Sequence, residues 1–301
     1  MNIKLKQKDL SFLHSIAEYG LVTIRQISAL ERIGLRAANK RVKALYDAGL
    51  VNSKQRGFSS SKGRPELVIS LSEKGARILQ SESGIDPVIP IDQLTGVAIT
   101  HIEHQLLINW VIIHLLHIER KIPSLSVSFY SSTTPFLPRR KDGRPLISDS
   151  VKIGDEEVRF IPDGAFSIAS NDRGKRLLFF LEVDLSTESL TSQSAGNDLE
   201  KKLLKYREYF RSGGYKRYQK AWDCQFNGFR LLVIANSSRR MEGISRLVRD
   251  MPSSDFVWVT DQEHMFIHGL SAKIWARGGH TDQPLHSILG PTLACESPLT
   301  I

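Results

Sequence analysis

Apolar residues in the first quarter of the chain recur at the spacing of amphipathic helices. Three helices are predicted, over residues 8–19, 24–32 and 35–48. Gly20 is suited to end the first helix, and Thr23 is suited to cap the second. The apolar face of the first helix consists of Leu10, Leu13, Ile16 and Ala17. Two short helices joined by a turn that contains glycine are typical of the helix-turn-helix motif.

The third predicted helix divides its residues between two faces. The residues expected to face the core are Ala38, Val42, Leu45 and Tyr46. The opposite face carries cations and one amide, namely Arg36, Asn39, Lys40 and Lys43. Side chains of these kinds contact phosphates and base edges in DNA. The face therefore predicts a DNA contact, and the alternative is an ordinary solvated helix surface.

Strand-like spacing follows the third helix. Two strands are predicted with a basic loop between them, at residues 50–55, 57–66 and 67–72. Lys62 and Arg64 lie at the tip of that loop, and residues 73–79 predict a fourth helix. The segment DAGLV…GRPELVISLSEKGARIL resembles many winged-helix DNA-binding domains. The resemblance implies a winged helix over residues 1–80, and a homodimer is one expectation because the fourth helix often mediates dimerisation in such domains.

Beyond a proline-containing linker at residues 81–95, the pattern predicts one mixed α/β domain. Residues 96–120 predict a long helix that is apolar nearly all round. The predicted strands are residues 124–130, 158–170, 176–186, 229–237 and 255–261, and the predicted later helices are residues 198–210 and 239–251. Residues 158–170 form either two short strands or one bent strand around Pro162. This order is typical of a mixed sheet flanked by helices. We expect this domain to cover residues 96–278, followed by a C-terminal extension over residues 279–301.

The distribution of charge along the chain indicates a binding partner. The net charge of +9 lies entirely in residues 1–80, which contain 15 Lys and Arg residues against 6 Asp and Glu residues. A localised basic excess is typical of a module that binds phosphates, although a basic domain without such a partner is the alternative. No apolar stretch reads as a signal peptide or membrane span, and Cys224 and Cys295 indicate neither a disulfide framework nor a cysteine metal site. We expect a cytoplasmic protein that binds double-stranded DNA and no membrane.

Acidic residues gather where one buried strand ends. In FFLEVDLSTES, Glu182 and Asp184 point to the same face of the strand, and Glu188 follows at its exit. Asp163 begins the preceding strand, and a hairpin centred on residue 173 sets it opposite Val183. Three carboxylates, Asp163, Glu182 and Asp184, then converge. Such hard oxygen ligands suit Mg²⁺ or Mn²⁺, which can polarise a phosphoryl oxygen. The alternative is a set of solvated acids at a turn.

Several segments carry a resemblance to a known family. The pattern RFIPDGAFSI … LLFFLEVDLSTESL … KKLLKYREYF … FRLLVIANSSRRMEGISRLV … FVWVTD resembles the replication-relaxation family of bacterial plasmids and mobile elements, over roughly residues 8–261. The resemblance implies a winged helix followed by a domain like the PD-(D/E)XK nucleases. Those nucleases place an Asp and a (D/E)-X-K motif on adjacent strands after an initial helix.

The resemblance assigns site residues. It implies that Asp163 and Glu182 hold the metal and that Glu103, on the initial helix, takes an accessory acidic position. The sequence departs from the motif because Asp184 stands where the nucleases carry lysine. Lys202, on the following helix, is the candidate to supply the catalytic cation instead. The implied function is a metal-dependent DNA endonuclease that nicks or relaxes DNA in plasmid replication or mobilisation.

Other interpretations stay open. The first is a non-catalytic DNA-binding factor of replication or transcription with a degenerate nuclease fold. Covalent nicking by Tyr206 or Tyr209 is another, although Tyr206 lies on the apolar helix face. The histidines that invite a zinc interpretation are His101, His104, His114 and His117, and core histidines are the alternative. The sequence contains no Gly-rich phosphate loop, so a regulator with a small ligand is disfavoured and no nucleotide cofactor is expected.

Overall fold

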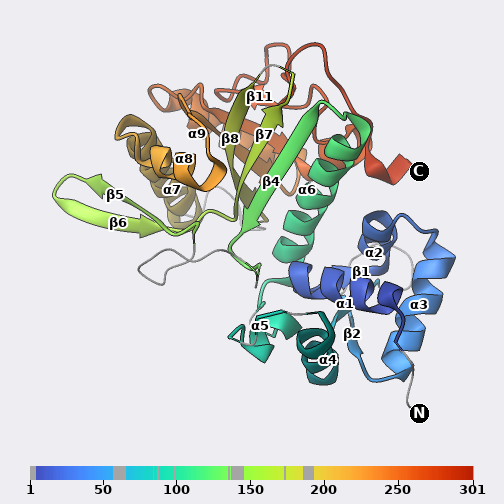
Figure 1. Ribbon diagram of the computed structural model, residues 1–301. Helices are drawn as coiled ribbons and strands as arrows, with labels where there is room; N and C mark the ends of the chain where they lie inside the picture. Colours follow the sequence, from blue (N-terminus) through green and yellow to red (C-terminus); the bar gives the residue numbers. More distant parts are fainter. Residues whose placement is uncertain are drawn as a thin grey trace. The chain divides into compact units, whose positions relative to one another are not determined.

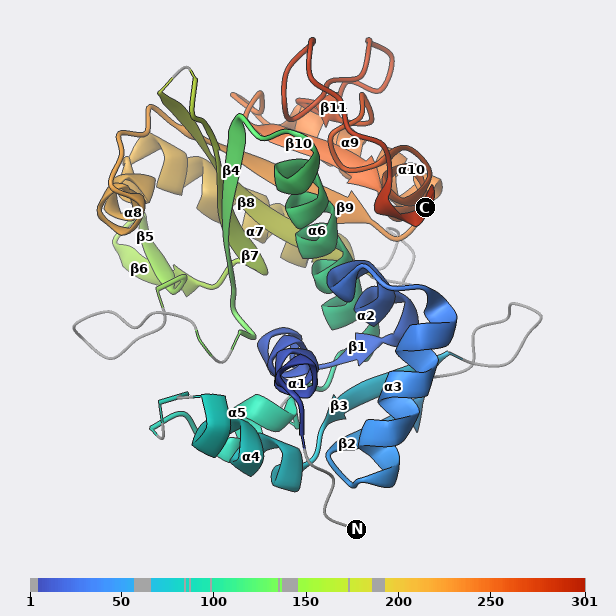
Figure 2. The same cartoon turned by 45° about the vertical axis from the view of Figure 1, so that its right-hand side comes forward.

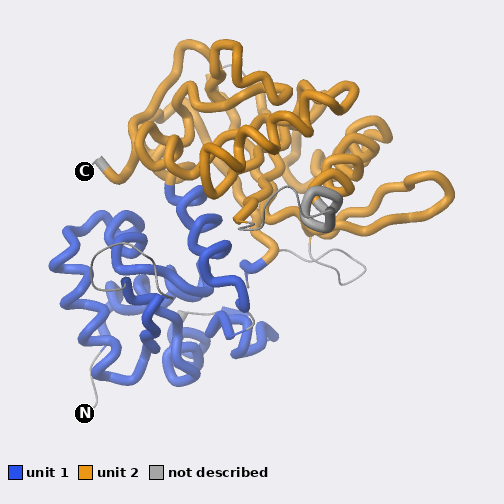
Figure 3. Tube along the Cα trace, turned by 180° about the vertical axis from the view of Figure 1, so that it is seen from behind, with its two compact units in different colours: residues 1–113, 133–137 blue, residues 114–132, 138–301 orange. Residues whose placement is uncertain are grey.

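The computed structural model in Figure 1 describes the chain from residue 5 to residue 300 with several gaps. The described residues are 5–56, 66–83, 85–86, 88–97, 99–134, 136, 146–172, 174–185 and 193–300, of which 83, 193–198 and 300 are described by their backbone alone. The chain forms two compact units, shown in Figure 3. Unit 1 comprises residues 1–113 and 133–137, and unit 2 comprises residues 114–132 and 138–301.

Unit 1 is a helix-turn-helix followed by a β-hairpin. Its elements are α1 (Gln7–Tyr19), β1 (Val22–Thr23), α2 (Ile24–Glu31), α3 (Leu35–Asp47), β2 (Val51–Gln55), β3 (Leu67–Leu71), α4 (Glu73–Ser83) and α5 (Ile91–Thr95). The three strands form an antiparallel sheet in the order β1-β3-β2. This is the winged-helix order of elements. Two more helices follow the hairpin, and α5 forms inside the segment predicted as a linker.

Local sequence signals define the helix ends in unit 1. The hydroxyl of Thr23 accepts a hydrogen bond from the backbone N–H of Gln26 at 3.3 Å, and the Gln26 side chain accepts one from the N–H of Thr23 at 3.1 Å. This reciprocal pair satisfies N–H groups that the first turn of α2 leaves unpaired. Gly20 has a φ of 71°, which a residue with a side chain adopts at a cost, and it ends α1 as predicted.

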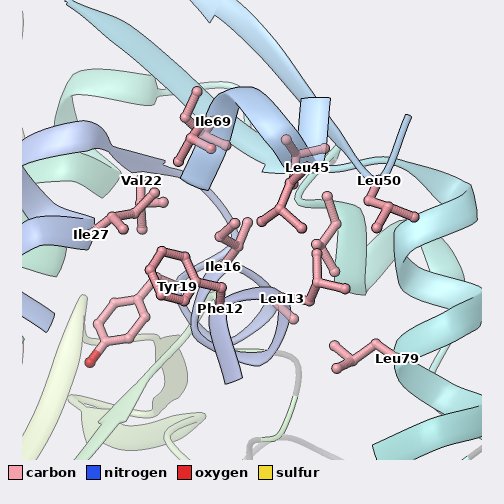
Figure 4. Close-up of a cluster of buried hydrophobic side chains, with 14 of the residues drawn as sticks. Phe12, Leu13, Ile16, Tyr19, Val22, Ile27, Leu45, Leu50, Ile69 and Leu79 are labelled. Atoms are coloured by element: carbon pink, nitrogen blue, oxygen red, sulfur yellow. The ribbon is translucent and has the colours of Figure 1, made fainter. Parts of the chain in front are cut away.

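The core of unit 1 lies between the helices and the small sheet. Figure 4 shows Leu13 and Ile16 from α1 directed toward Leu45 of α3 and Ile69 of β3. All four side chains are almost completely buried. The prediction that Tyr46 faces this core is wrong, because its side chain is 52% exposed. One residue beyond Leu45 is a turn of about 100° around a helix, which takes Tyr46 off the buried face.

Unit 2 is built on one six-stranded mixed sheet. Its strands lie in the order β11-β10-β9-β8-β7-β4 (Figure 2). Their bounds are β4 (Leu125–Ser131), β7 (Gly164–Ser170), β8 (Lys175–Asp184), β9 (Phe229–Ala235), β10 (Val257–Asp261) and β11 (Ala276–Arg277). The neighbours β8, β9 and β10 are parallel, and the remaining pairs are antiparallel.

Helices cover this sheet. They are α6 (Ile102–Lys121, of which residues 114–121 belong to unit 2), α7 (Gln193–Arg211), α8 (Tyr218–Trp222), α9 (Ser238–Asp250) and α10 (Gln262–His268). Right-handed crossovers between parallel strands place α7 and α9 on one face of the sheet. The view in Figure 2 shows α6 in front of the sheet and α7 and α9 behind it. No helix in the described part of the chain combines the length and apolar character needed to cross a membrane.

Two details of unit 2 concern the strands around Pro162 and the C-terminal extension. The segment predicted as one bent strand or two short ones forms β6 (Glu156–Phe160) and β7, separated at Pro162, and β6 pairs with β5 (Asp149–Ile153) outside the main sheet. The last part of the chain packs on the domain, because Ile288 is fully buried and the backbones of Trp275 and His286 pair.

Candidate functional site

The carboxyl end of β8 holds the predicted acids. Gly164 of β7 pairs with Leu181 of β8, so continuing the ladder by one residue sets Asp163 opposite Glu182. The expected partner of Asp163 was Val183. Ser170 pairs with Lys175, so the centre of the hairpin lies between residues 172 and 173. The partner of Asp163 is therefore one residue earlier on β8 than expected. The N–H of Val183 nevertheless donates a hydrogen bond to Oδ2 of Asp163 at 2.7 Å, which fixes that carboxylate at the strand end.

Helix α7 brings a cation and a phenol to Glu182. The side chain of Glu182 is 3% exposed and faces α7. Its Oε1 accepts a hydrogen bond from the hydroxyl of Tyr206 at 2.5 Å, and its Oε2 forms an ion pair with Nζ of Lys202. Lys202 and Tyr206 are four residues apart on the helix and so share one face. The structure thus brings together Asp163, Glu182, Tyr206 and Lys202, the cation that the resemblance named as a substitute.

The electrostatics of this group are strongly perturbed. Burial, and then the nearby Asp163 carboxylate, raise the pKa of Glu182 from 4.5 to about 8. Burial alone would lower the pKa of Lys202, but the carboxylates of Glu182 and Asp163 raise it, so Lys202 stays a cation. Burial, and then Glu182, hold the pKa of Tyr206 well above its usual value. Perturbed groups of this kind concentrate at functional sites.

Asp184 lies two residues beyond Glu182 on β8 and has a different partner. Its Oδ2 binds the guanidinium of Arg240, on α9, at 2.9 Å from Nη2 and 3.3 Å from Nε. Arg240 is 6% exposed, so this is a buried ion pair. Sequence reasoning missed Arg240. The signal was the SSRR stretch directly after the buried strand that became β9, since a helix beginning there returns its first turn to the carboxyl ends of the parallel strands.

The donor set limits how a metal ion could bind. Within the described residues, no group of three or more His, Cys, Asp and Glu side chains could hold a metal ion. Asp163 and Glu182 are the two adjacent carboxylates, and both are hard oxygen ligands. Burial, and then the charge of Asp163, raise the pKa of Glu182, and a divalent cation bound by the two carboxylates would offset their repulsion. If a divalent cation such as Mg²⁺ or Mn²⁺ binds here, these two residues are the side chains that could hold it.

The other predicted residues lie elsewhere. Glu103 belongs to unit 1, where it forms an ion pair with Arg56. Glu188 lies outside the described residues. The backbone N–H of Leu270 donates a hydrogen bond to Nδ1 of His114 at 3.3 Å. Burial, and then His117, lower the pKa of His114 to about 3, so it is a neutral core residue. Its environment agrees with the alternative of packing histidines.

Both tyrosines named as nucleophile candidates are engaged in the interior. Tyr206 is fully buried against Glu182. Tyr209 is 1% exposed, and its hydroxyl donates to Asp149 at 2.5 Å. Burial, and then Asp149, raise the pKa of Tyr209 above its usual value. Protonated, buried phenols favour a supporting role over covalent nicking.

The polar face of α3 is the candidate nucleic-acid interface of unit 1. Its four predicted contacts are all exposed, namely Arg36, Asn39, Lys40 and Lys43. Asn39 donates to the carbonyl of Leu35 at 2.9 Å, and Lys43 pairs with Asp47 at 3.1 Å, so both contact their own helix turn. The predicted wing-tip residues Lys62 and Arg64 lie outside the described residues.

Comparison with known proteins assigns the chain to a family. None of the curated proteins matches it. A solved structure of a mutant of ZitR from Lactococcus lactis is similar at 22% identity with a TM-score of 0.24, over 28% of this chain and 53% of that one, so the chain spans about half the length of that protein. The replication-relaxation family matches residues 13–223, which is more than two thirds of the 301 residues. The chain therefore belongs to the replication-relaxation family.

Proposed function

We propose that this protein is a DNA-binding endonuclease of plasmid or mobile-element replication or mobilisation, which nicks DNA with a divalent metal ion at the carboxyl end of β8. The observation that carries the proposal is the contact of Lys202 with Glu182. The motif position that nucleases fill with lysine is Asp184 here, so catalysis needs a cation from another element. Helix α7 delivers one to the buried carboxylate of Glu182.

The order of elements supports the same assignment. Helix α6 precedes β4, β7 and β8, which are antiparallel neighbours, and α7 then leads to β9, which is parallel to β8. This is the helix, three strands, helix and strand expected from the resemblance to PD-(D/E)XK nucleases. Asp163 directly precedes β7, and Glu182 lies two residues before the end of the neighbouring strand β8. These positions resemble those of the acidic residues in such nucleases.

Each residue of the site has a separate chemical role. Asp163 and Glu182 would hold Mg²⁺ or Mn²⁺, which when bound supplies Lewis-acid polarisation of a phosphoryl oxygen. Lys202 places a positive charge beside the carboxylates, where it can stabilise negative charge that develops on the phosphate. Tyr206 fixes the orientation of Glu182 through its hydroxyl. The burial of Glu182 excludes water from this carboxylate and strengthens each electrostatic contact.

Unit 1 supplies the targeting. In the helix-turn-helix arrangement the second helix of the motif enters the major groove, and α3 is that helix here. It exposes Arg36 and Lys40, which are suited to bind phosphates or guanine edges. The basic excess of residues 1–80 supports salt-sensitive binding to double-stranded DNA at an origin or transfer site.

One observation favours a second candidate, a DNA-binding factor that does not cut. Asp184 and Glu182 each have a basic partner, Arg240 and Lys202. A nuclease-like domain that had lost its metal could fill its acidic site with such ion pairs. This second candidate keeps the binding function of unit 1 and assigns a structural role to the carboxylates.

A plasmid nicking assay separates the two candidates. Supercoiled DNA is incubated with the protein in a Mg²⁺ and Mn²⁺ series, and binding is measured in parallel by fluorescence anisotropy. Lys202→Met should lower the nicking rate by a factor of about 10²–10³, the usual loss for one group that stabilises the transition state. Asp163→Ala and Glu182→Gln should abolish nicking and leave duplex binding unchanged.

Matched controls test whether the effect is local. Lys201→Met removes the neighbouring exposed lysine of α7, and Asp155→Asn removes an exposed acid beyond β5. Both controls should nick at the wild-type rate. A wild-type protein that binds DNA but never nicks it in any metal would support the non-cutting candidate. Nicking that survives Asp163→Ala would refute this site.

A further inference from the structure

A second concave site lies at the opposite end of the same sheet. A pocket of about 640 Å³ opens at the amino ends of β8, β9 and β10. Lys175 at the start of β8 lines it, whereas Glu182 is seven residues further along that strand, or about 23 Å at the usual rise of a β-strand. The pocket is therefore separate from the carboxylate pair, and its volume is in the range of small-molecule sites.

Positive charge dominates the pocket. Its basic lining residues are Lys175, Arg176, Arg230 and Arg277. Among its described lining residues the acidic one is Asp255, which pairs with Arg277 at 2.8 Å. The remaining polar side chains are the uncharged Gln225 and Asn227. This excess of cations in a concavity attracts an anion and disfavours a neutral or cationic ligand.

Arg230 is held in place for such an anion. Its guanidinium lies 4.4 Å from the ring centre of Trp258 and 5.8 Å from that of Phe179, and its Nη1 donates to the carbonyl of Ile288 at 3.4 Å. Burial, and then the charge of Arg277, lower the pKa of Arg230. A guanidinium fixed on aromatic rings keeps the donors at its edge for bidentate binding of a phosphate.

The pocket also offers an apolar surface. Phe210 and Phe256 line it with their rings stacked at 5.2 Å between centres. Phe210 is half-buried, and the side chain of Leu177 is 44% exposed. Cationic grooves with aromatic surfaces bind the phosphates and bases of nucleotides, because every base has a face that stacks. An inorganic anion alone would leave this apolar part of the pocket uncovered.

We propose that this pocket binds a nucleotide, with the phosphate between Arg230 and Arg277 and the base against Phe210 and Leu177. The nucleotide is either free or a unit of a DNA single strand, and both present the same phosphate and base. The site uses side chains in place of a glycine-rich loop, which explains why the sequence showed no phosphate-binding fingerprint. It is independent of the proposed cleavage, since none of its residues contacts Glu182 or Lys202 through any described interaction.

Binding to the full-length protein in EDTA tests the proposal without any cleavage. Isothermal titration uses thymidine monophosphate, inorganic phosphate and a short single-stranded oligothymidylate. Arg277→Gln and Arg230→Gln should each weaken binding about tenfold to a hundredfold, the usual loss of a charge-assisted hydrogen bond. Arg246→Ala, which removes an exposed cation of α9 outside the pocket, is the matched control and should bind as the wild type does.

Each outcome of the titrations supports or overturns the proposed nucleotide site. Mononucleotide binding that is lost in the pocket variants supports a free nucleotide as the ligand. Binding of the oligonucleotide alone, with the same sensitivity, supports a DNA strand as its source. Phosphate that binds as tightly as the mononucleotide overturns the base contact. Equal affinities of the wild type and both pocket variants for every probe overturn the proposal, and Arg277→Gln keeps this test valid if Arg230→Gln fails to fold.

Discussion

The buried Glu182 carboxyl makes a direct prediction about stability and pH. We expect Glu182→Gln to remove a pH-dependent loss of stability that the wild-type protein shows without metal. The substitution keeps an oxygen that can accept the hydrogen bond of Tyr206, and it removes the ionisation. Lys202 loses one carboxylate partner but still interacts with the negative charge of Asp163. The comparison therefore isolates the titration of one side chain.

The magnitude follows from the raised pKa. Glu182 has a pKa of about 8 in the folded protein, against 4.5 for an ordinary glutamate. Between these values the folded state holds a proton that the unfolded chain has released, so the contribution is complete below pH 4.5 and is lost as the pH rises through 8. The slope is about −1.4 kcal/mol per pH unit, which amounts to about 4 kcal/mol between pH 5 and pH 8.

Urea unfolding in EDTA, followed by tryptophan fluorescence, measures this effect. Three of the four tryptophans, Trp222, Trp258 and Trp275, belong to unit 2, so the signal reports mainly on the domain that contains Glu182. The quantity to plot is the difference in unfolding free energy between the wild type and Glu182→Gln at each pH. His114, whose pKa is lowered, makes both proteins less stable in acid and cancels in this difference.

The wild type should lose stability relative to Glu182→Gln as the pH rises. A difference that stays constant within about 0.5 kcal/mol from pH 5 to pH 8 would refute the reasoning, because surface-like carboxylates behave in that way. Saturating Mg²⁺ adds a second arm. At 100 times its dissociation constant, a bound ion should restore about 2.7 kcal/mol to the wild type at pH 8 and less to Glu182→Gln.

Three further predictions follow from other contacts. Arg240→Ala leaves the Asp184 carboxylate without its buried partner and should lower the unfolding free energy by about 3–5 kcal/mol in urea titrations, whereas the paired change to two apolar residues should recover much of that loss. Leu45→Ala should cost about 2–5 kcal/mol because Leu45 is buried, while Tyr46→Ala should change stability by less than about 0.5 kcal/mol, and similar losses would contradict the observed faces of α3. Arg36→Ala should weaken duplex binding and reduce the slope of log affinity against log salt by about 1, and an unchanged slope would exclude Arg36 as a phosphate contact.

Within unit 1, local signals were sufficient for most of the structure. The capping box at Thr23 and the left-handed conformation of Gly20 involve residues only a few positions apart, so the sequence states them directly. The exposed face of α3 followed from helical spacing alone. Tyr46 was misplaced because it lies at the margin of the apolar stripe, where helical spacing allows either face. Packing in the core of unit 1 buried Leu45 and left Tyr46 exposed.

In unit 2, the sequence identified the acids but not all of their partners. Strand alternation correctly put Glu182 and Asp184 on one face, and the resemblance pointed to Lys202 as the substitute cation. The partner of Asp184 was missed, because Arg240 reaches it from a helix 56 residues away along the chain. Which basic residue pairs with Asp184 depends on which helix begins beside the end of β8.

The sequence by itself determined the order of the long helices and of most strands of the main sheet, the basic surface of unit 1 and the placement of carboxylates at the end of a buried strand. These features depend on spacing and composition, which can be read from residues that are neighbours along the chain. Only the tertiary structure decided the register that sets Asp163 opposite Glu182, the division of basic partners between Glu182 and Asp184, and the basic pocket at the far end of the sheet. Each of these brings together residues from two or more elements, and their closeness is fixed by packing of the whole domain.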